Sequence, residues 1–532
     1  MKRLPVGIQS IREILNERYV YVDKTEYVYT LMNDAKHYFL SRPRRFGKSL
    51  LLDTISSVFS GDKELFKGLW IYDSDCEFIK HPVIRLDMSG ISNGSPDILE
   101  KSLFLELKKR IGADGLDIPD AYPADMLKFL IEGLYEKYGQ KVVVLIDEYD
   151  KPMLDHLTNL QTAEANRDIL RGFYGILKSM DKYLRFTFIT GVTKFAKTSI
   201  FSGLNYLYDI SLSMKYANIC GITNANLNEY FDEHISKLTS LSDFNHIANL
   251  HDEILKWYDG YSWDGKTRVL NPFSLLCFFA HKKFFGFWFE SGSPKFLIDL
   301  IKKNPETYIK INKSKISEFM LDAADFYRLA PESLMFQSGY LTISKIDITR
   351  GAPVYHLIMP NHEVRETLNL HIIAGFADCG GDGAQMAKYE MEDALQAGDL
   401  AEIRAILKRL FASIPYNLHV DVEAYYHSIF YAVMTVLGFN IDAEVAVSKG
   451  RIDAVLELSD KIYVMEFKYE NCAPDADAKE KHALFDKALE NGMNQIKNRG
   501  YQNKYAGGGK VVYLAAFAFL GRDDIEMEVE II

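Results

Sequence analysis

A lysine between a glycine and a serine, Gly47-Lys48-Ser49, stands where an apolar run ends and a helical pattern begins. A loop in that position suits phosphate. Backbone N–H groups at the start of a helix hold phosphate oxygens, the lysine neutralises them, and the serine hydroxyl ligates Mg²⁺. The usual form of such a loop has a further glycine where this chain has Arg42. The spacing therefore predicts a phosphate-binding loop that departs from the usual pattern at one position.

Acidic and hydroxyl side chains follow two further apolar runs. The run VVVLIDE ends in Asp147 and Glu148, so that the first acid can reach a phosphate-bound Mg²⁺ and the second can polarise an attacking water. The run FTFIT ends in Thr190, and Thr193 follows, where a polar sensor beside a γ-phosphate would stand. A threonine-rich strand end without that role explains both residues equally well. Together with the loop, the acidic pair predicts nucleotide binding.

Two arginines precede the glycine of the loop. Arg44 and Arg45 can face phosphate or an acidic neighbouring domain, and a solvated pair of charges is the alternative of equal weight. We count Arg45 among the nucleotide-binding candidates, together with Gly47, Lys48 and Ser49.

A second group of charged residues lies near the C-terminus, in KGRIDAVLELSDKIYVMEFKYE. Two β-type runs flank Ser459-Asp460, which predicts a hairpin. With those residues as the turn, Asp453 and Glu466 face each other with Cβ atoms about 4.5–5.5 Å apart, close enough to share one divalent cation. Carboxylates suit Mg²⁺ or Mn²⁺, and Lys468, on the same face as Glu466, can orient the metal-bound water or stabilise charge. An amphipathic hairpin with solvated charges is the alternative.

The elements that would carry these residues form an α/β protein. Short β-type runs alternate with helical patterns up to about residue 215, as in a parallel sheet. The predicted strands are Lys36–Leu40, Val83–Leu86, Val142–Ile146 and Phe186–Thr190, and helices are expected at Lys48–Val58, Pro96–Lys109 and Ala165–Met180. The next part, 216–375, has the pattern of polar helices broken by aromatic loops. Helical lids and winged-helix folds have this pattern, and so do many domain spacers; the winged-helix element is an analogy, and a spacer is the alternative of equal weight.

The C-terminal part follows a turn-rich segment at Ala377–Gln385, which we interpret as the boundary of a third domain, 376–532. Its expected elements are helices at Ala387–Gln396, Leu400–Ala412, Val422–Leu437 and Lys479–Arg499, the hairpin, and a strand at Val511–Leu520.

Composition limits the classes of function. The 532 residues carry 62 Lys and Arg against 73 Asp and Glu, a net charge of −11, so any contact with nucleic acid needs a local basic groove. The 5 cysteines are scattered and lack metal-ligand spacing, which indicates a reducing compartment. The longest apolar run is too short to span a membrane, and the N-terminus lacks an apolar leader. We expect a cytoplasmic protein with no membrane partner.

The first half of the chain resembles the AAA-ATPase-like family of bacterial proteins. The motifs that carry the resemblance are YVDKTEYVYTL, FLSRPRRFGKSLLL, VLIDEYDKP and ITGVTKFAKTSIFSGLN, over about 1–215. It implies that Arg42 is a family trait and that ATP is the ligand, with the roles carried by Lys48, Ser49, Asp147 and Glu148.

The C-terminal part, about 385–530, resembles the PD-(D/E)XK nuclease superfamily through Asp453, Glu466 and Lys468, although Ile452 replaces the proline of the name. The resemblance implies a restriction-endonuclease-like α/β fold and adds residues outside the hairpin. Glu423 matches an acidic metal ligand on a preceding helix, and His427 lies one turn later. The superfamily often carries a Gln and a Tyr on the helix that follows the hairpin, and Gln495 and Tyr501 are similar to that pair. Contacts to a nucleic-acid backbone are suggested for Lys497, Arg499 and Lys504, and a solvated helix face is the equal alternative.

Two hypotheses follow. The first is an ATP-regulated or ATP-driven, Mg²⁺-dependent nuclease. The second is a nucleotide-gated binding or signalling protein whose nuclease-like domain holds nucleic acid without cutting it. Retention of Asp453, Glu466 and Lys468 together favours the first. We expect DNA rather than RNA as the partner, although backbone chemistry does not specify the sugar. The possibility of a homo-oligomer is open.

Overall fold

The computed structural model describes residues 1–157, 159–194, 200, 207–288, 314–321, 331–348, 351–377, 380–412, 430, 440–447, 450–458, 460–473, 476–505, 509–520 and 524–532. Contacts divide the chain into two units. Unit 1 comprises Met1–Ser291 and Lys313–Glu363, and unit 2 comprises Gly292–Asn312 and Val364–Ile532. The division into 1–215, 216–375 and 376–532 stays a prediction.

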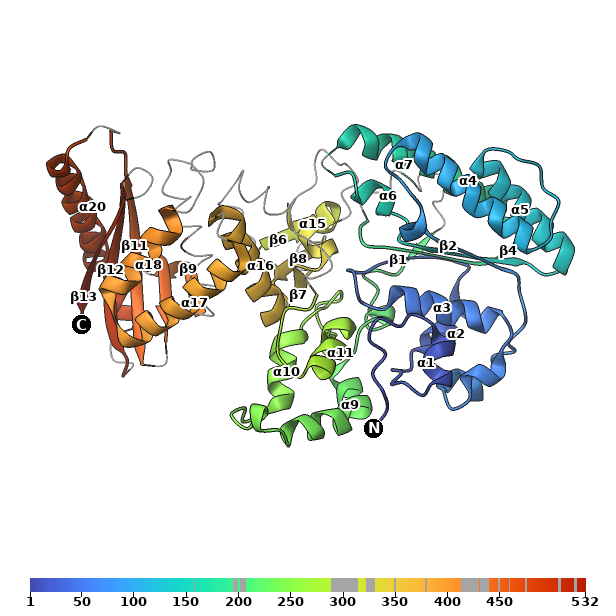
Figure 1. Cartoon of the computed structure of the whole chain (residues 1–532), viewed down its shortest axis with the longest axis horizontal. Coiled ribbons are helices and arrows are strands. Elements are labelled where there is room, and N and C mark those ends of the chain that lie inside the picture. Colours follow the sequence, from blue (N-terminus) through green and yellow to red (C-terminus); the bar gives the residue numbers. More distant parts are fainter. Residues whose placement is uncertain are drawn as a thin grey trace. The chain divides into compact units, whose positions relative to one another are not determined.

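A five-stranded parallel sheet forms the centre of unit 1, in the order β2-β3-β4-β1-β5 (Figure 1). Its strands are β1 (His37–Ser41), β2 (Val83–Asp87), β3 (Val142–Asp147), β4 (Leu184–Gly191) and β5 (Tyr208–Asp209). The predicted α/β class is confirmed, as are the four predicted strands. β4 lies between β1 and β3, so the predicted phosphate loop, Thr190 and the acidic pair meet at the carboxyl edge of the sheet.

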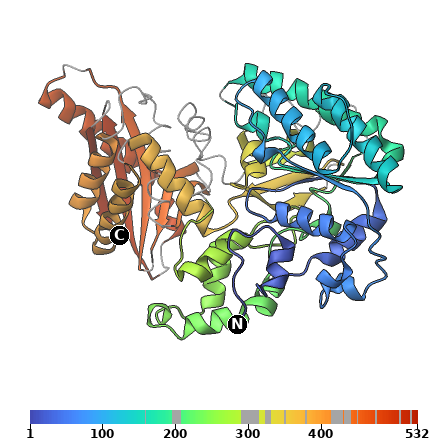
Figure 2. The same cartoon turned by 45° about the vertical axis from the view of Figure 1, so that its right-hand side comes forward.

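Helices cover both faces of this sheet (Figures 1 and 2). One face carries α1 (Ile11–Asn16), α2 (Thr25–Asp34) and α3 (Lys48–Phe59). The other carries α4 (Pro96–Ala113), α5 (Pro123–Tyr138) and α7 (Leu160–Ser179), with the short α6 (Lys151–Leu154) after the acidic pair. The three predicted helices correspond to α3, α4 and α7. The Ser95 hydroxyl caps α4, and Pro96 begins it, as expected at a helix N-terminus.

The rest of unit 1 is a middle segment of helices and a small sheet, which confirms the predicted helical middle. Its helices are α9 (Asn224–Thr239), α10 (Leu250–Tyr258), α11 (Pro272–His281), α14 (Glu318–Leu321) and α15 (Pro331–Ser338). The strands β6 (Ser314–Ser317), β7 (Thr342–Asp347) and β8 (Val354–Ile358) form an antiparallel sheet in the order β6-β8-β7. The winged-helix analogy stays a prediction. α16 (His362–Ala377) continues the chain into unit 2.

A buried carboxyl group lies where the middle segment ends. Glu363 is fully buried, and its Oε1 accepts hydrogen bonds from Ser274 Oγ and the Trp288 backbone N–H, each at 2.9 Å. Burial raises the pKa of Glu363 from 4.5 to about 8.

That pKa makes the stability of unit 1 depend on pH. The folded state keeps a proton that the unfolded chain releases between about pH 4.5 and pH 8, so the free energy of unfolding falls as pH rises through this window. Glu363→Gln does not titrate and should flatten the dependence, so that its advantage over the wild type grows with pH. Thermal unfolding followed by tryptophan fluorescence tests this, because all 4 tryptophans, at 70, 257, 263 and 288, lie in unit 1. Parallel pH profiles would contradict it.

Unit 2 contains a five-stranded mixed sheet in the order β13-β12-β11-β10-β9. The strands are β9 (Asn440–Val447), β10 (Gly450–Glu457), β11 (Lys461–Glu470), β12 (Val511–Leu520) and β13 (Asp524–Ile531). β11 and β12 are parallel and the other pairs antiparallel. The helices are α17 (Gly380–Ala397), α18 (Leu400–Ala412) and α20 (Ala478–Arg499). The predicted strand at 511–520 and the helices at 400–412 and 479–499 are confirmed, and the β10–β11 hairpin has the predicted register, with Ala454 opposite Met465.

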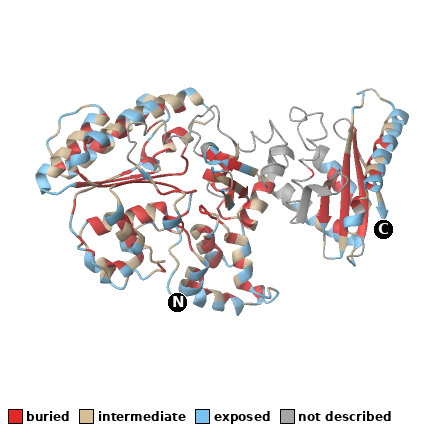
Figure 3. Ribbon diagram, turned by 180° about the vertical axis from the view of Figure 1, so that it is seen from behind, coloured by how far each residue is buried: buried red, intermediate tan, exposed pale blue. Residues whose placement is uncertain are grey.

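One expectation about unit 2 needs correction. Residues 380–385, expected to be turn-rich, are the first residues of α17; a glycine costs a helix only about 1 kcal/mol, and packing of the rest of α17 offsets it. The domain boundary placed at this segment stays a prediction. The central strands of the sheet are buried on both faces (Figure 3). Met493 and Ile496 of α20 cover the face that carries Glu466. The predicted helix Val422–Leu437 lies outside the described residues except for Phe430, which packs against Phe467 on the opposite face.

Candidate nucleotide and metal sites

The loop from β1 to α3 is shaped by two residues in the left-handed backbone region, Arg45 with φ 70° and Gly47 with φ 88°. Arg42 is not among the residues with positive φ, so its position does not need a glycine. Its side chain is fully buried, donates to the carbonyls of Ser41 and Ser211 at 2.9 and 2.7 Å, and lies 3.9 Å from the Trp263 ring centroid. Arg42, which stands where the usual loop has a glycine, therefore makes specific contacts of its own.

Lys48, the first residue of α3, points back into the loop. Its Nζ donates to the carbonyls of Arg42 and Pro43, both at 2.9 Å. Burial lowers the pKa of Lys48, and the nearby Asp147 and Glu148 oppose this shift. The Lys48 ammonium group is thus buried, bonded to two carbonyls and close to two acids. Phosphate oxygens can replace those carbonyls as its hydrogen-bond acceptors.

The acidic pair and the threonine lie at the same sheet edge. Asp147 is buried, and its Oδ1 accepts from Thr190 Oγ1 at 2.6 Å and from the Glu148 backbone N–H at 3.1 Å. Glu148 has a left-handed backbone with φ 52°. Burial raises the pKa of Glu148, which Lys48 opposes. The strained backbone and the raised pKa are typical of a carboxyl group placed for chemistry. Thr193 instead donates through Oγ1 to buried Asp150 at 2.6 Å, away from Asp147.

A polar cleft of about 440 Å³ opens beside the loop. Arg44, Arg45, Lys48, Ser49 and Glu148 line it together with residues of the N-terminus and of α11. The Arg45 guanidinium lies 4.3 Å from the ring centroid of Phe273. The cleft therefore presents cationic side chains, a serine hydroxyl and an acid to one ligand.

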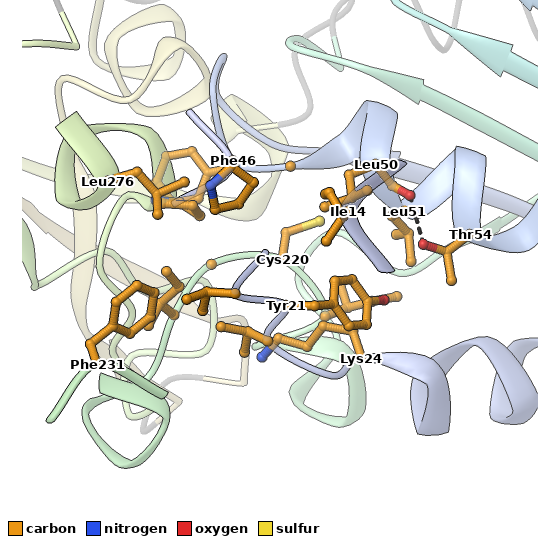
Figure 4. Close-up of a pocket in the computed structure, with 18 residues that line it drawn as sticks. Ile14, Tyr21, Lys24, Phe46, Leu50, Leu51, Thr54, Cys220, Phe231 and Leu276 are labelled. Atoms are coloured by element: carbon orange, nitrogen blue, oxygen red, sulfur yellow. Dashed lines mark hydrogen bonds between the residues drawn. The ribbon is translucent and has the colours of Figure 1, made fainter. Parts of the chain in front are cut away.

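An apolar cavity of about 110 Å³ adjoins the cleft and shares Gly47, Leu50 and Leu276 with it. Figure 4 shows its walls, with side chains from α1, α3, residues 219–222 and the middle segment turned inward. The ammonium group of Lys24, another lining residue, donates to Asn226 Oδ1 at 3.2 Å, and burial lowers its pKa to about 8. The space suits a flat apolar group joined to the ligand of the cleft.

In unit 2, Glu466 is buried beside Lys468 and Asp453. Glu466 Oε1 accepts from Lys468 Nζ at 3.0 Å, and Asp453 Oδ2 accepts from the Phe467 backbone N–H at 2.9 Å. The pKa of Glu466 is raised to about 7, first by burial and then by the neighbouring Asp453. The three side chains predicted to share one face of the hairpin are thus brought together.

Gln495 of α20 also reaches this site, where its Nε2 donates to Glu466 Oε1. Tyr501 is buried and accepts from Arg499 Nη1 at 3.0 Å. Lys497, Arg499 and Lys504 are all exposed, and Lys497 is paired with Glu530. The three cationic residues suggested for a nucleic-acid backbone are therefore accessible, and Lys497 already has an acidic partner.

The residues present fit a divalent cation. Glu466 Oε2 is buried and accepts no hydrogen bond from the described part of the chain, and a second carboxyl group lies beside it. Adjacent buried carboxylates need a proton or a cation between them. Groups of three or more His, Cys, Asp or Glu side chains suited to a metal are absent among the described residues. Glu423 and His427 lie outside that part of the chain.

The comparisons with known proteins agree with this division. Residues 5–201 match the family described as Predicted AAA-ATPase, and residues 421–528 match the PD-(D/E)XK nuclease superfamily. The chain belongs to a family in which an AAA-ATPase-like domain precedes a PD-(D/E)XK nuclease superfamily domain. It is 35% identical, over 97% of its length and 96% of the relative's, to an "Uncharacterized protein in vnfD 5'region" of Azotobacter chroococcum mcd 1.

Sequence reasoning missed the residues that hold the loop from behind and those that line the apolar cavity. Apart from the loop and α3, they come from residues 5–24 and 216–288. Tyr21 and Lys24 stand in the motif YVDKTEYVYTL, but nothing in that motif places it beside the loop. The aromatic clusters around Trp257–Lys266 and at Asn271–Leu276 were the available signal, because aromatic residues gathered in polar loops usually pack against another part of the protein.

No helix in the described part of the chain is both long and apolar enough to cross a membrane.

Proposed function

We propose that this protein binds and hydrolyses ATP with Mg²⁺ in unit 1, and that unit 2 cleaves nucleic-acid phosphodiesters with Mg²⁺ or Mn²⁺ under control of the nucleotide. The observation that supports this most is common to both units. Each brings a lysine and two carboxyl groups to one site, Lys48 with Asp147 and Glu148, and Lys468 with Asp453 and Glu466. The test is a metal-dependent cleavage assay with and without ATP.

In unit 1, Lys48 and the N–H groups at the start of α3 bind the phosphates, with Arg45 adding positive charge. Ser49 and Asp147 would hold Mg²⁺, which neutralises charge on the phosphates. Thr190 fixes the Asp147 carboxylate by its hydrogen bond. Glu148 accepts the proton of the attacking water, a role that its raised pKa suits.

The base of the nucleotide would occupy the apolar cavity next to Gly47. Val22→Trp, at a position that lines the cavity and not the cleft, should fill the cavity and weaken ATP binding by about 10-fold or more, since each 1.4 kcal/mol of lost contact is tenfold in affinity. Inorganic tripolyphosphate, which lacks the base, should bind the variant as it binds the wild type. Calorimetric titration checks both ligands, with the exposed Leu105→Trp on α4 as control. Unchanged ATP affinity would place the base elsewhere.

In unit 2, Asp453 and Glu466 would hold the divalent cation, with Glu423 as a further ligand. When bound there, the cation would polarise the scissile phosphate and lower the pKa of a water molecule. Lys468 stabilises the charge that develops on the phosphate, and Gln495 orients Glu466 through its hydrogen bond. Exposed Arg499 and Lys504 give the backbone of the nucleic acid, DNA in our proposal, a local cationic contact in a protein of net charge −11. A cytoplasmic location and a homo-oligomer remain predictions.

A further inference from the structure

Four aromatic side chains of the middle segment contact the phosphate loop. They are Tyr261, Trp263, Phe273 and Trp288, and we call them the aromatic cradle. The ring of Phe46 in the loop meets Tyr261 and Trp263 edge to face, with centroids 4.7 and 5.4 Å apart. Arg42 stacks on Trp263 and Arg45 on Phe273. These contacts lie within unit 1 and bind the loop to a segment far away in the sequence.

Trp288 contacts the loop differently from the other three. Its indole Nε1 donates a hydrogen bond to the Arg44 carbonyl at 3.2 Å, and its side chain is 7% exposed. Gly339 packs so closely that a Cβ there would lie 2.9 Å from Pro43 Cβ and 3.0 Å from Trp288 Cζ2. The Tyr340 ring lies 5.2 Å from that of Trp288. The loop and Trp288 therefore cannot shift independently.

The backbone of Trp288 is tied to a different element. Its N–H donates to Glu363 Oε1 at 2.9 Å, and Glu363 stands in the first turn of α16. α16 is the helix along which the chain passes from unit 1 to unit 2, with the division between Glu363 and Val364. Two hydrogen bonds through one residue thus join the Arg44 carbonyl to the start of α16.

Nucleotide binding must disturb the loop end of this path. Lys48 Nζ now donates to the carbonyls of Arg42 and Pro43, and a phosphate group that takes over the ammonium competes with both. Pro43 is adjacent to Arg44, whose carbonyl Trp288 holds. A change in the carbonyls at 42 and 43 therefore reaches the contact at 44.

We propose that Trp288 couples occupancy of the phosphate loop to the first turn of α16, as a positioning residue for nucleotide binding. The coupling rests on the proposed nucleotide function. It is reciprocal, so a change at Glu363 alters nucleotide affinity although Glu363 lies at the far end of the path.

A double-mutant cycle on the full-length protein tests the path. The affinity of Mg²⁺ and AMP-PNP, a non-hydrolysable ATP analogue, is measured by calorimetry for Trp288→Phe, Glu363→Met and the double variant. Phenylalanine keeps a ring but has no Nε1–H, and methionine removes the acceptor for the Trp288 N–H. Each single change should weaken binding by about 5-fold or more, the lower end of usual couplings, and the double variant should be no weaker than the worse single variant. If the double variant instead weakens binding by the product of the two single effects, the proposal is wrong.

Two further variants separate coupling from damage. Glu363→Gln keeps an acceptor at the same position and should restore wild-type affinity. Trp257→Phe removes a similar Trp–Glu contact of the middle segment, from Trp257 Nε1 to Glu253 at 3.2 Å, and should leave affinity unchanged. If Glu363→Gln and Trp257→Phe both weaken nucleotide binding, the cause is a general loss of packing, and the proposal is contradicted.

Hydrogen exchange gives a readout at the other end of the path. AMP-PNP should change amide exchange across residues 362–371 in the wild type and not in Trp288→Phe at saturating ligand. If the wild type binds AMP-PNP without any such change, or if the change persists in Trp288→Phe, Trp288 is not the connection. If the wild type binds no AMP-PNP at all, the proposed nucleotide function fails and the coupling fails with it.

Discussion

Lys48→Ala should weaken the binding of Mg·ATP by about 10- to 100-fold. A hydrogen bond to a charged group contributes about 1.5–3 kcal/mol, and each 1.4 kcal/mol is tenfold in affinity. Lys48 is the buried cation that lines the polar cleft, and a phosphate chain that loses it keeps backbone donors, the Ser49 hydroxyl and more exposed cations such as Arg44 and Arg45. Calorimetric titration of the full-length protein measures the effect.

The matched control is Lys36→Ala. Lys36 precedes β1 and pairs with Asp181 at 2.6 Å, at the opposite end of the strand from the phosphate loop. It should bind ATP as the wild type does. Lys48→Ala should also keep its thermal unfolding transition without nucleotide, since the change removes a buried charge whose desolvation is unfavourable. Normal ATP affinity in Lys48→Ala would show that the phosphates bind elsewhere.

Glu466→Gln should reduce metal-dependent cleavage by at least about 100-fold. Loss of a residue that merely supports a metal ligand typically costs 10- to about 100-fold, and Glu466 is proposed as a ligand itself. Glutamine keeps the shape and the acceptor for Lys468 but lacks the charge that a divalent cation requires. Removal of Mg²⁺ with a chelator should have the same effect on the wild type, and cleavage of labelled oligonucleotides measures both.

Stability distinguishes a chemical effect of Glu466→Gln from unfolding. The pKa of Glu466 is raised from 4.5 to about 7, so without metal its charge destabilises the folded state as pH rises through that window. The variant should therefore be at least as stable as the metal-free wild type above pH 7, about the folded-state pKa. Glu470→Gln on the same strand, where Glu470 pairs with Lys487 at 3.2 Å, should cleave normally. Equal cleavage by Glu466→Gln and the wild type would remove Glu466 from the site.

The parts of the fold that could be predicted are those with a local signal. The apolar run Val142–Ile146 is buried on both faces, as a central parallel strand should be, and the β10–β11 hairpin has the predicted register because its turn fixes the pairing. The grouping of Asp147 with Thr190 followed from the rule that parallel strands end at one edge. The same rule could not place Thr193, which lies past the strand end and turns to Asp150.

The remaining features depend on contacts between distant residues. Nothing in the loop sequence indicates that Arg42 lies on Trp263 or that Phe46 contacts Tyr261 and Trp263, because tertiary packing brings residue 263 to residue 42. The burial of Glu466 was missed for a similar reason. An alternating strand indicates one polar face, but α20 covers that face and makes Glu466 a buried acid with a raised pKa.

In the proposed function, one chain couples an ATP site to a metal-dependent nuclease. The most direct test is a cleavage assay with Mg²⁺ on single- and double-stranded DNA and on RNA, with and without ATP, for the wild type, Lys48→Ala and Glu466→Gln. We expect the wild type to cut DNA at a rate that ATP changes, Lys48→Ala to cut at a rate that ATP does not change, and Glu466→Gln not to cut. A wild type that binds ATP but cuts none of these substrates under any condition would contradict the proposed function and leave a nucleotide-gated binding protein.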